Sequence, residues 1–464
     1  MLICVKVEEL AKVYPSRMEK RTEFSKLGLF DAHVPRYTSY PTAPHFSGDV
    51  GPDTFSHWVQ AVPENGQVSL YLHIPFCRRL CWFCACRTQG TQSGAPVRGY
   101  LDTLKVEIDM LAAQLAPGIT LSRMHWGGGT PTLLTSEMIT ELADHVAAVL
   151  PFGPNAEFSV EIDPGEIDQP RVDALAAAGM TRGSIGVQDF DPAIQKTIGR
   201  IQSYETTARA VDMLRAVGVT SLNTDILFGL PGQDREKITQ SVQKLLSLGP
   251  DRVALYGYAH VPWMARRQTM IPTDLLPKPE ERLRLFETAA RLFEWDGYDA
   301  IGIDHFARKD DGLAIARRNG TLRRNFQGYT DDTSDTLIGL GASSISKFPQ
   351  GYAQNAPVTS AYAGLVRGGG MATVKGHALT QEDLLRGRLI ERLMCDFKAS
   401  AAQFPGHEDH VSSILRKVAN AFEGAVKFDG NTLKIPADAA PLTRLIARAV
   451  DAYHMDRKGH ASAI

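Results

Sequence analysis

The chain has 464 residues, too many for one small domain, and this length predicts two or three units, one of them large. Apolar residues make up 44% and charged residues 22%, as in globular proteins with a substantial core. The 50 basic and 52 acidic residues nearly cancel, which disfavours a nucleic-acid-binding protein. No apolar run approaches the roughly 18 residues of a membrane span, and the start lacks a signal-peptide pattern, so we expect a cytoplasmic protein.

Residues 1–60 are predicted to form an extended N-terminal arm rather than a core element. The stretch "VPRYTSYPTAPHF" contains three prolines, and each biases the residue before it away from helix. Met18 could itself open the chain, which leaves open whether residues 1–17 belong to it.

From about residue 68, β-prone runs alternate with helix-like segments. The predicted strands span residues 68–74, 122–126, 157–162, 183–187, 221–228 and 252–258. Between the first two, apolar residues fall at helical spacing: Leu101, Leu104, Ile108, Leu111 and Leu115. This alternation predicts βαβ units around a parallel sheet, and about six units would form a barrel or a partial barrel. In such folds the working residues lie in the loops that follow the strands.

After about residue 370 the pattern becomes mostly helical. Thr380 and Asp383 match a capping box, and Asp429–Gly430 matches a hairpin turn. The sequence therefore predicts an α/β chain in three parts: an arm at 1–60, a barrel domain at 61–365 and a mostly helical domain at 366–464. For the last part, a packing or lid module is favoured over a winged helix.

Four of the six cysteines lie in one window after the first predicted strand, "IPFCRRLCWFCACRTQG". Cys77, Cys81 and Cys84 are spaced C-x3-C-x2-C, and Cys86 follows. Such clustering favours metal or redox chemistry over a disulfide scaffold. A structural zinc site would need a second pair of ligands, whereas thiolates commonly hold iron–sulfur clusters. Three ligands on a four-iron cluster would leave one iron open to a substrate or cofactor.

Polar or glycine-rich turns follow the later strands as well. "HWGGGTPT" at 125–132 allows close approach of a ligand to the backbone, although loop flexibility explains a glycine run equally well. Glu161 could hold a cationic amine, but a solvated turn is the commoner reason for such an acid. Asp225 could bind a ribose hydroxyl or cap a helix. The histidines at 73, 125, 260 and 305 are each interpreted as structural. "GTLRRNFQGYTDD" at 320–332 suits a carboxylate-bearing aromatic ligand, or is an ordinary surface loop.

Taken together, these motifs closely resemble the oxygen-independent coproporphyrinogen III oxidases of the radical S-adenosylmethionine (SAM) superfamily. The similarity covers roughly residues 30–400 and rests on "PRYTSYPTAPHF", "YLHIPFCRRLCWFCAC", "HWGGGTPT", "GVQDFD" and "RRNFQGYT". It implies a radical SAM barrel, one [4Fe–4S] cluster and two SAM molecules. It also implies an anaerobic reaction, in which a 5′-deoxyadenosyl radical takes hydrogen from two propionate side chains of coproporphyrinogen III. These chains lose CO2 and become the vinyl groups of protoporphyrinogen IX, a step of haem synthesis.

The resemblance also assigns roles to residues. The implied cluster ligands are Cys77, Cys81 and Cys84. The implied contacts of the cluster-bound SAM are Tyr71, Gly128, Glu161 and Ile345. The implied contacts of the second SAM are Phe83, Gly129, Thr130, Gln188, Arg200, Asp225 and Ala259. Phe326 and Gln327 would lie near both cofactors and the substrate, and Cys86 would have a catalytic role that the resemblance leaves unspecified.

The sequence departs from the family at Trp82 and Ala85, where tyrosine and glycine are common, and this puts the local loop geometry in question. The substrate carries four carboxylates, so we expect basic residues near it, with Arg36, Arg323 and Arg324 as candidates.

Two alternatives share the cysteine pattern: a non-catalytic haem-binding chaperone and a radical SAM methyltransferase that opens haem. The "RYTSYPT" and "RRNFQGYT" segments favour the oxidase. The expected partners are coproporphyrinogen III, a reducing electron donor and a terminal electron acceptor, neither of which the sequence identifies. Balanced charge and the lack of coiled-coil heptads favour a monomer.

Overall fold

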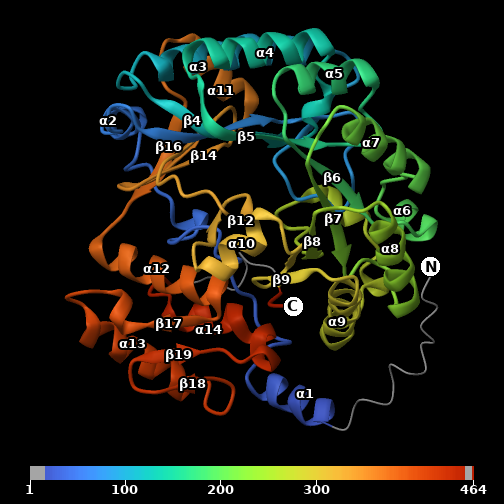
Figure 1. Ribbon diagram of the computed structural model, residues 1–464, viewed down its shortest axis with the longest axis vertical. Helices are drawn as coiled ribbons and strands as arrows, with labels where there is room; N and C mark the ends of the chain where they lie inside the picture. The colour runs from blue at the N-terminus through green and yellow to red at the C-terminus, as the bar shows by residue number, and fades with distance from the viewer. Residues whose placement is uncertain (1–15, 455–461) are drawn as a thin grey trace.

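The computed structural model describes residues 16–454 and 462–464, and its centre is one large mixed sheet (Figure 1). Residues 1–15, most of the segment before Met18, lie outside the described residues. Seven neighbouring strands run parallel: β13 (Leu337–Leu340), β1 (Gln67–Ile74), β4 (Thr120–Gly128), β5 (Phe152–Ile162), β6 (Arg182–Gln188), β7 (Ser221–Phe228) and β8 (Arg252–Gly257). The six predicted strands are confirmed as β1 and β4 to β8.

Antiparallel strands extend the sheet at both edges. Beyond β13 these are β14 (Ile345–Phe348), β15 (Gly351–Asn355) and β16 (Thr373–Ala378). Beyond β8 they are β10 (His305–Ala307) and β9 (Asp299–Ile301). The parallel part of the barrel therefore runs from β13 to β8, and antiparallel strands flank it on both sides, so the barrel is open.

Helices connect the parallel strands and cover the outer face of the sheet (Figure 1). They are α3 (Ala95–Ala112), α4 (Ser136–Val149), α5 (Gln169–Ala177), α6 (Pro192–Thr197), α7 (Tyr204–Ala216), α8 (Arg235–Ser247) and α9 (Pro279–Trp295). The predicted helix with its apolar stripe is α3, and Leu115 lies beyond its end while still packing against the core. The βα succession from β1 to α9 gives the expected α/β partial (β/α)6 barrel.

Alternate residues of each parallel strand face different surroundings. Leu70, Leu72 and Ile74 of β1 are buried against the helices. Tyr71 and His73 point to the opposite, inner face, as period-two side-chain alternation requires. The strand register carries this pattern across the sheet, so the inner face collects polar side chains.

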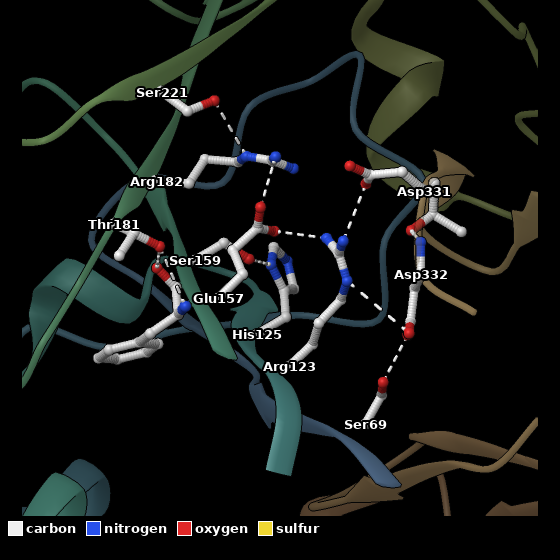
Figure 2. A network of polar contacts seen from close by, with 12 residues as sticks. Ser69, Arg123, His125, Glu157, Ser159, Thr181, Arg182, Ser221, Asp331 and Asp332 are labelled. Carbon is white, nitrogen blue, oxygen red and sulfur yellow. Dashed lines mark hydrogen bonds and ion pairs between the residues drawn. The ribbon is translucent and has the colours of Figure 1, made fainter. Parts of the chain in front are cut away.

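Ion pairs fill the inner face at the amino ends of the strands (Figure 2). The Glu157 carboxylate accepts from Arg123 at 2.9 Å and from Arg182 at 2.5 Å. Arg123 also lies 3.0 Å from Asp331 and 3.7 Å from Asp332. This network closes the amino end of the barrel and leaves the carboxyl end for a binding site.

The C-terminal part packs below the barrel in the view of Figure 1. It contains α12 (Gln381–Asp396), α13 (Glu408–Ala421), α14 (Thr443–Val450) and a small sheet of β17 (Lys398–Ser400), β19 (Thr432–Lys434) and β18 (Lys427–Phe428). The capping box of Thr380 and Asp383 and the hairpin at Asp429–Gly430 are confirmed. The predicted boundaries at 60/61 and 365/366 stay predictions.

The N-terminal arm does contribute to a core, so its prediction as an element outside the core is wrong. It contains helices α1 (Ser16–Lys26) and α2 (Pro52–Gln60). Between them, Val34, Tyr37 and Tyr40 are buried among side chains of α12 to α14. The prolines do keep this stretch out of helix, but its aromatic side chains pack against apolar residues of the C-terminal helices, more than 300 residues away in the chain.

Four further elements complete the fold. They are α10 (Gly312–Asn319), β11 (Arg323–Asn325), β12 (Gly328–Thr330) and α11 (Thr359–Arg367). Of these, β11 contacts α12 and α11 packs against α3. In the described residues no helix is both long enough and apolar enough to cross a bilayer.

Candidate active site

The cysteine loop follows β1 and is tied down at both ends. Its first residues form β2 (Phe76–Cys77), which pairs with β3 (Gln89–Gly90) where the loop returns. In the middle, the Trp82 amide donates to the Ile198 carbonyl at 2.9 Å. Ala85 has no positive φ, so an alanine replaces glycine there without backbone strain. The loop geometry questioned from the sequence therefore accommodates this chain's residues.

The cysteine thiols have donors of their own. The Arg200 guanidinium donates to Cys81 Sγ at 3.6 Å, and the Cys86 amide donates to Cys84 Sγ at 3.4 Å. A hydrogen bond from the Cys86 thiol, followed by that from its amide, lowers the pKa of Cys84 to about 6 against the effect of burial. Burial raises the pKa of Cys77. Hydrogen bonds of this kind to cysteine sulfur stabilise thiolates and tune iron–sulfur clusters.

The donor set fits an iron–sulfur cluster better than a single metal ion. Among the described residues, no three His, Cys, Asp or Glu side chains are grouped closely enough to hold one ion. A four-iron cluster presents a different iron to each thiolate, so its ligands stand farther apart than those of a single ion. Cys77, Cys81 and Cys84 are free thiols on one loop and can each ligate a different iron of such a cluster.

The glycine run at the end of β4 packs against this loop. A Cβ at Gly129 would lie 2.5 Å from the Phe76 carbonyl oxygen, and Gly128 has a φ of +113°. The Gly128 amide donates to Glu161 Oε2 at 2.9 Å. Glycine is therefore required here, because a side chain would push the strand end away from the cysteine loop.

Glu161 belongs to a polar group on the inner face. Tyr71 donates to or accepts from His73 Nδ1 at 2.9 Å and stacks on His125, with ring centres 5.7 Å apart. His125 Nε2 lies 3.5 Å from Glu161 Oε1. Burial alone would raise the pKa of Glu161, but His125 and the Gly128 amide lower it. The carboxylate is 43% exposed and so can accept from a cationic ligand.

The sequence reasoning missed two members of this group. His73 and His125 were interpreted as structural residues, yet they stand beside Tyr71 and Glu161. The alternation of side chains along a strand could have identified them. Positions 71 and 73 lie on the same face of β1, and position 125 of β4 pairs with position 71.

Arg200 links the cysteine loop to the ends of β5 and β6. It lies 3.3 Å from Asp163 and donates to the Gly186 carbonyl at 3.0 Å, besides its contact with Cys81. Its buried Nε has no hydrogen-bond partner among the described residues. Gln188, nearby at the end of β6, has a φ of +71°, an unusual value outside glycine. An unpartnered buried donor of this kind points to a bound acceptor.

Asp225 lies on the inner face of β7, opposite Gly186 and Ala254. Asn223 donates to its Oδ1 at 2.9 Å. Burial, and then the charge of Glu161, raise the pKa of Asp225 to about 6. The predicted alternative of a helix cap is wrong, because Asp225 stands inside a strand.

Phe83 and Ala259 are joined through a residue that the sequence reasoning did not select. Gln268 Nε2 donates to the Phe83 carbonyl at 2.7 Å and to the Ala259 carbonyl at 3.0 Å. This amide therefore links the cysteine loop to the segment after β8. Thr130, the remaining predicted contact, is buried and donates its amide to the Phe76 carbonyl at 2.8 Å.

Phe326 and Gln327 form the turn between β11 and β12. Phe326 packs edge-on against Tyr352 of β15, with ring centres 5.7 Å apart, and Gln327 is exposed. Gly328, which directly follows this turn, adjoins β8, since a Cβ there would lie 3.4 Å from the Tyr256 hydroxyl. Ile345 begins β14 and pairs with Gln354 of β15. The hairpin thus lies between the two sides of the open barrel.

The three candidate arginines differ in their partners. Arg323 lies 3.3 Å from Glu391, whereas the buried Nη1 of Arg324 lies 3.9 Å from Asp304 and makes no hydrogen bond with a described residue. Arg36 donates to the Gly257 carbonyl at 2.7 Å and makes no ion pair with a described residue. Arg36 and Arg324 are therefore better placed than Arg323 to receive a further carboxylate.

Known proteins match this chain over nearly its whole length. The radical SAM superfamily pattern matches residues 71–245. An oxygen-independent coproporphyrinogen III oxidase of Paracoccus denitrificans is 60% identical over 96% of this chain and 100% of its own length. The chain belongs to the oxygen-independent coproporphyrinogen III oxidases.

Other members of this family support the assignment at lower identity. The Escherichia coli oxidase is 39% identical over 90% of this chain and 93% of its own length. A solved structure of the Escherichia coli coproporphyrinogen III oxidase, described as a radical SAM enzyme, superposes with a TM-score of 0.86 at 36% identity. That superposition covers 91% of this chain and 100% of the other.

Proposed function

We propose that this oxidase decarboxylates two propionate side chains of coproporphyrinogen III to vinyl groups, giving protoporphyrinogen IX without oxygen, in haem synthesis. The observation that carries this function is the match to family members along their entire length, with the cysteine loop at the carboxyl end of the parallel strands. Membership of the radical SAM superfamily implies a [4Fe–4S] cluster and SAM. When bound, the reduced cluster and SAM supply a 5′-deoxyadenosyl radical that abstracts hydrogen from the propionate β-carbon.

The residues proposed to hold the cluster are Cys77, Cys81 and Cys84. The donors that Arg200 and the Cys86 amide aim at two of these sulfurs favour their thiolate forms. We assign Cys86 a place beside the cluster rather than on it, because it falls after the C-x3-C-x2-C set and its amide donates to Cys84 Sγ at 3.4 Å.

For the cluster-bound SAM, the proposed contacts are Tyr71, Gly128, Glu161 and Ile345. Glu161 accepts hydrogen bonds from the SAM ammonium group, because its half-exposed carboxylate stays ionised beside His125. The Gly128 amide holds Glu161 in place. Tyr71 stacks on His125 beside Glu161 on the inner face.

A second SAM is proposed at the residues Phe83, Gly129, Thr130, Gln188, Arg200, Asp225 and Ala259. Two observations support it: Arg200 Nε is buried without a described hydrogen-bond partner, and Asp225 stands on an inner strand face without an ion pair to a described residue. Arg200 donates to the carboxylate of this SAM, and Asp225 accepts from its ribose. Phe326 and Gln327, on the hairpin across the open side, are proposed to contact both cofactors and the substrate.

Arg36 and Arg324 are proposed to bind substrate carboxylates, with Arg323 in a lesser role because Glu391 already neutralises it. Each would be replaced by alanine and the affinity for coproporphyrinogen III measured. Weaker binding in Arg36→Ala and Arg324→Ala is expected. Unchanged affinity in all three variants contradicts this assignment.

The decisive experiment is anaerobic reconstitution with iron and sulfide, followed by SAM, dithionite and coproporphyrinogen III. We expect 5′-deoxyadenosine and protoporphyrinogen IX. Haem binding without vinyl formation would favour a chaperone, and methyl transfer from labelled SAM would favour a methyltransferase. A lack of 5′-deoxyadenosine contradicts every radical SAM function.

A cytoplasmic monomer, with a donor that reduces the cluster and a terminal acceptor for the electron that the substrate radical loses, completes this proposal. These points rest on the sequence pattern and on the redox balance of the reaction. Each decarboxylation removes two electrons from the substrate side chain: one leaves with the hydrogen atom that the SAM-derived radical abstracts, and the other must leave through an acceptor.

A further inference from the structure

Three segments at the cysteine loop lack acidic residues, and two of them carry several arginines. Residues 78–89, 261–270 and 355–360 contain no Asp or Glu, although the whole chain is nearly neutral. Their arginines are Arg78, Arg79, Arg87, Arg266 and Arg267. Arg87 and Arg266 are exposed and make no ion pair with any described residue. We call the exposed surface of these three segments the loop surface.

Large apolar side chains are exposed among these arginines. Trp263 is 56% exposed, Met264 60% and Val358 59%. Single exposed apolar residues are common, but a group rimmed by one sign of charge marks an interaction site.

Direct contacts join the segments into one surface over the cysteines. Arg267 donates to Thr88 Oγ1 at 3.1 Å, and Gln268 donates to the Phe83 carbonyl at 2.7 Å. A hollow of about 350 Å³ opens between the segments, and Cys84, Cys86 and Val358 are among the residues that line it. The loop surface therefore lies directly above the proposed cluster ligands.

We infer that the loop surface binds an acidic one-electron carrier protein that reduces the cluster. This inference rests on the proposed function, which requires a reduced cluster. The carrier is oxidised by one electron and the cluster is reduced by one, with no bond formed or broken. The cationic rim attracts an acidic partner over distance, and the apolar centre gives a small interface, as electron-transfer complexes have.

The anionic substrate is the other ligand that this charge suits, and the experiment separates the two. The test variant is Arg87→Glu/Arg266→Glu, because neither side chain takes part in the proposed cofactor or substrate contacts. The matched control is Arg209→Glu/Arg416→Glu, which reverses two exposed charges on α7 and α13. Both would be reconstituted with the cluster and compared with the wild type.

The probe is reduced flavodoxin, an acidic one-electron carrier. Its binding is measured by calorimetry, and cluster reduction is followed anaerobically by the loss of visible absorbance as ionic strength varies. We expect reduction by flavodoxin to slow about tenfold or more at low salt in the test variant, with a flatter salt dependence. Replacing Trp263 by serine should weaken binding without changing the salt dependence.

Dithionite serves as the internal reference, because it reduces the cluster without docking. Dithionite-driven turnover and the KM for coproporphyrinogen III should be unchanged in the test variant. Equal flavodoxin rates in the test variant and the wild type would overturn the inference. A raised KM with dithionite would also overturn it and assign the surface to the substrate. Failure of dithionite-driven turnover in the wild type would instead count against the proposed function. The measurements of flavodoxin binding and cluster reduction would still test the loop surface in that case.

Discussion

Glu107 of α3 is a fully buried carboxyl group behind the site, and its replacement gives a sharp test of the structure. Its Oε2 accepts from the Gly341 amide and the Tyr362 hydroxyl, each at 2.7 Å. Its Oε1 accepts from Asn355 Nδ2 at 2.6 Å. These bonds anchor the turn between β13 and β14, which leads to Ile345.

Burial, partly offset by these hydrogen bonds, raises the pKa of Glu107 from 4.5 to about 7. A raised pKa means that the folded state holds the proton more tightly than the unfolded state. The stability from Glu107 is therefore complete below about pH 4.5 and is lost as the pH rises through about 7. The shift corresponds to about 3 kcal/mol of unfolding free energy.

Glu107→Gln cannot titrate, so it should lack this part of the pH dependence. Urea unfolding of the reconstituted protein, followed by tryptophan fluorescence, would be compared between about pH 4.5 and about pH 8. The difference in unfolding free energy between variant and wild type should change by about 3 kcal/mol in favour of the variant as the pH rises. Glu408→Gln, at an exposed position of α13, is the control. Equal pH dependence in Glu107→Gln and the wild type would refute the burial argument.

Three further predictions concern the cluster, SAM and the barrel. Cys81→Ser should lose the cluster, measured by iron content and visible absorbance, whereas Cys86→Ser should keep it; cluster loss in Cys86→Ser would show that the ligand set is wrong. If Asp225 binds SAM as a carboxylate, SAM affinity measured by calorimetry should fall below about pH 6 in the wild type, and Asp225→Asn should bind weakly with no such step; a step retained in the variant would assign it to another group. Asp311→Ala should lower the unfolding free energy by about 3–5 kcal/mol, because it leaves Arg252 buried without its closest ion-pair partner, 2.6 Å away; a loss below about 1 kcal/mol in urea unfolding would mean that this pair is solvated.

Much of the site was predictable because its residues follow strands directly. The cysteine spacing, the glycine run and Glu161 each lie within a few residues of a strand end, and parallel strands bring their carboxyl ends to one edge. The strands themselves were predictable because buried runs such as 68–74 are short, β-prone and bounded by turns.

Other parts of the site depend on partners far away in the chain. Arg200 reaches Cys81 across 119 residues, and Gln268 reaches Phe83 across 185. The family resemblance names Arg200 but not its contact with Cys81, and no local pattern marks Gln268, because a polar side chain on a loop looks the same whether it meets solvent or a carbonyl. The burial of Tyr37 and Tyr40 in the C-terminal core was missed for the same reason.

The amino-acid sequence by itself determined the barrel class, the cluster-binding loop and the family of this oxidase. These rest on short-range features: strand period, helix period, turn chemistry and the spacing of three cysteines. The tertiary structure alone decided which polar groups face one another across the inner face, how the arm joins the C-terminal core and where the arginines gather above the cysteines. Those contacts arise from the packing of distant segments, and the free energy that selects them depends on the surfaces that meet rather than on any one stretch of residues.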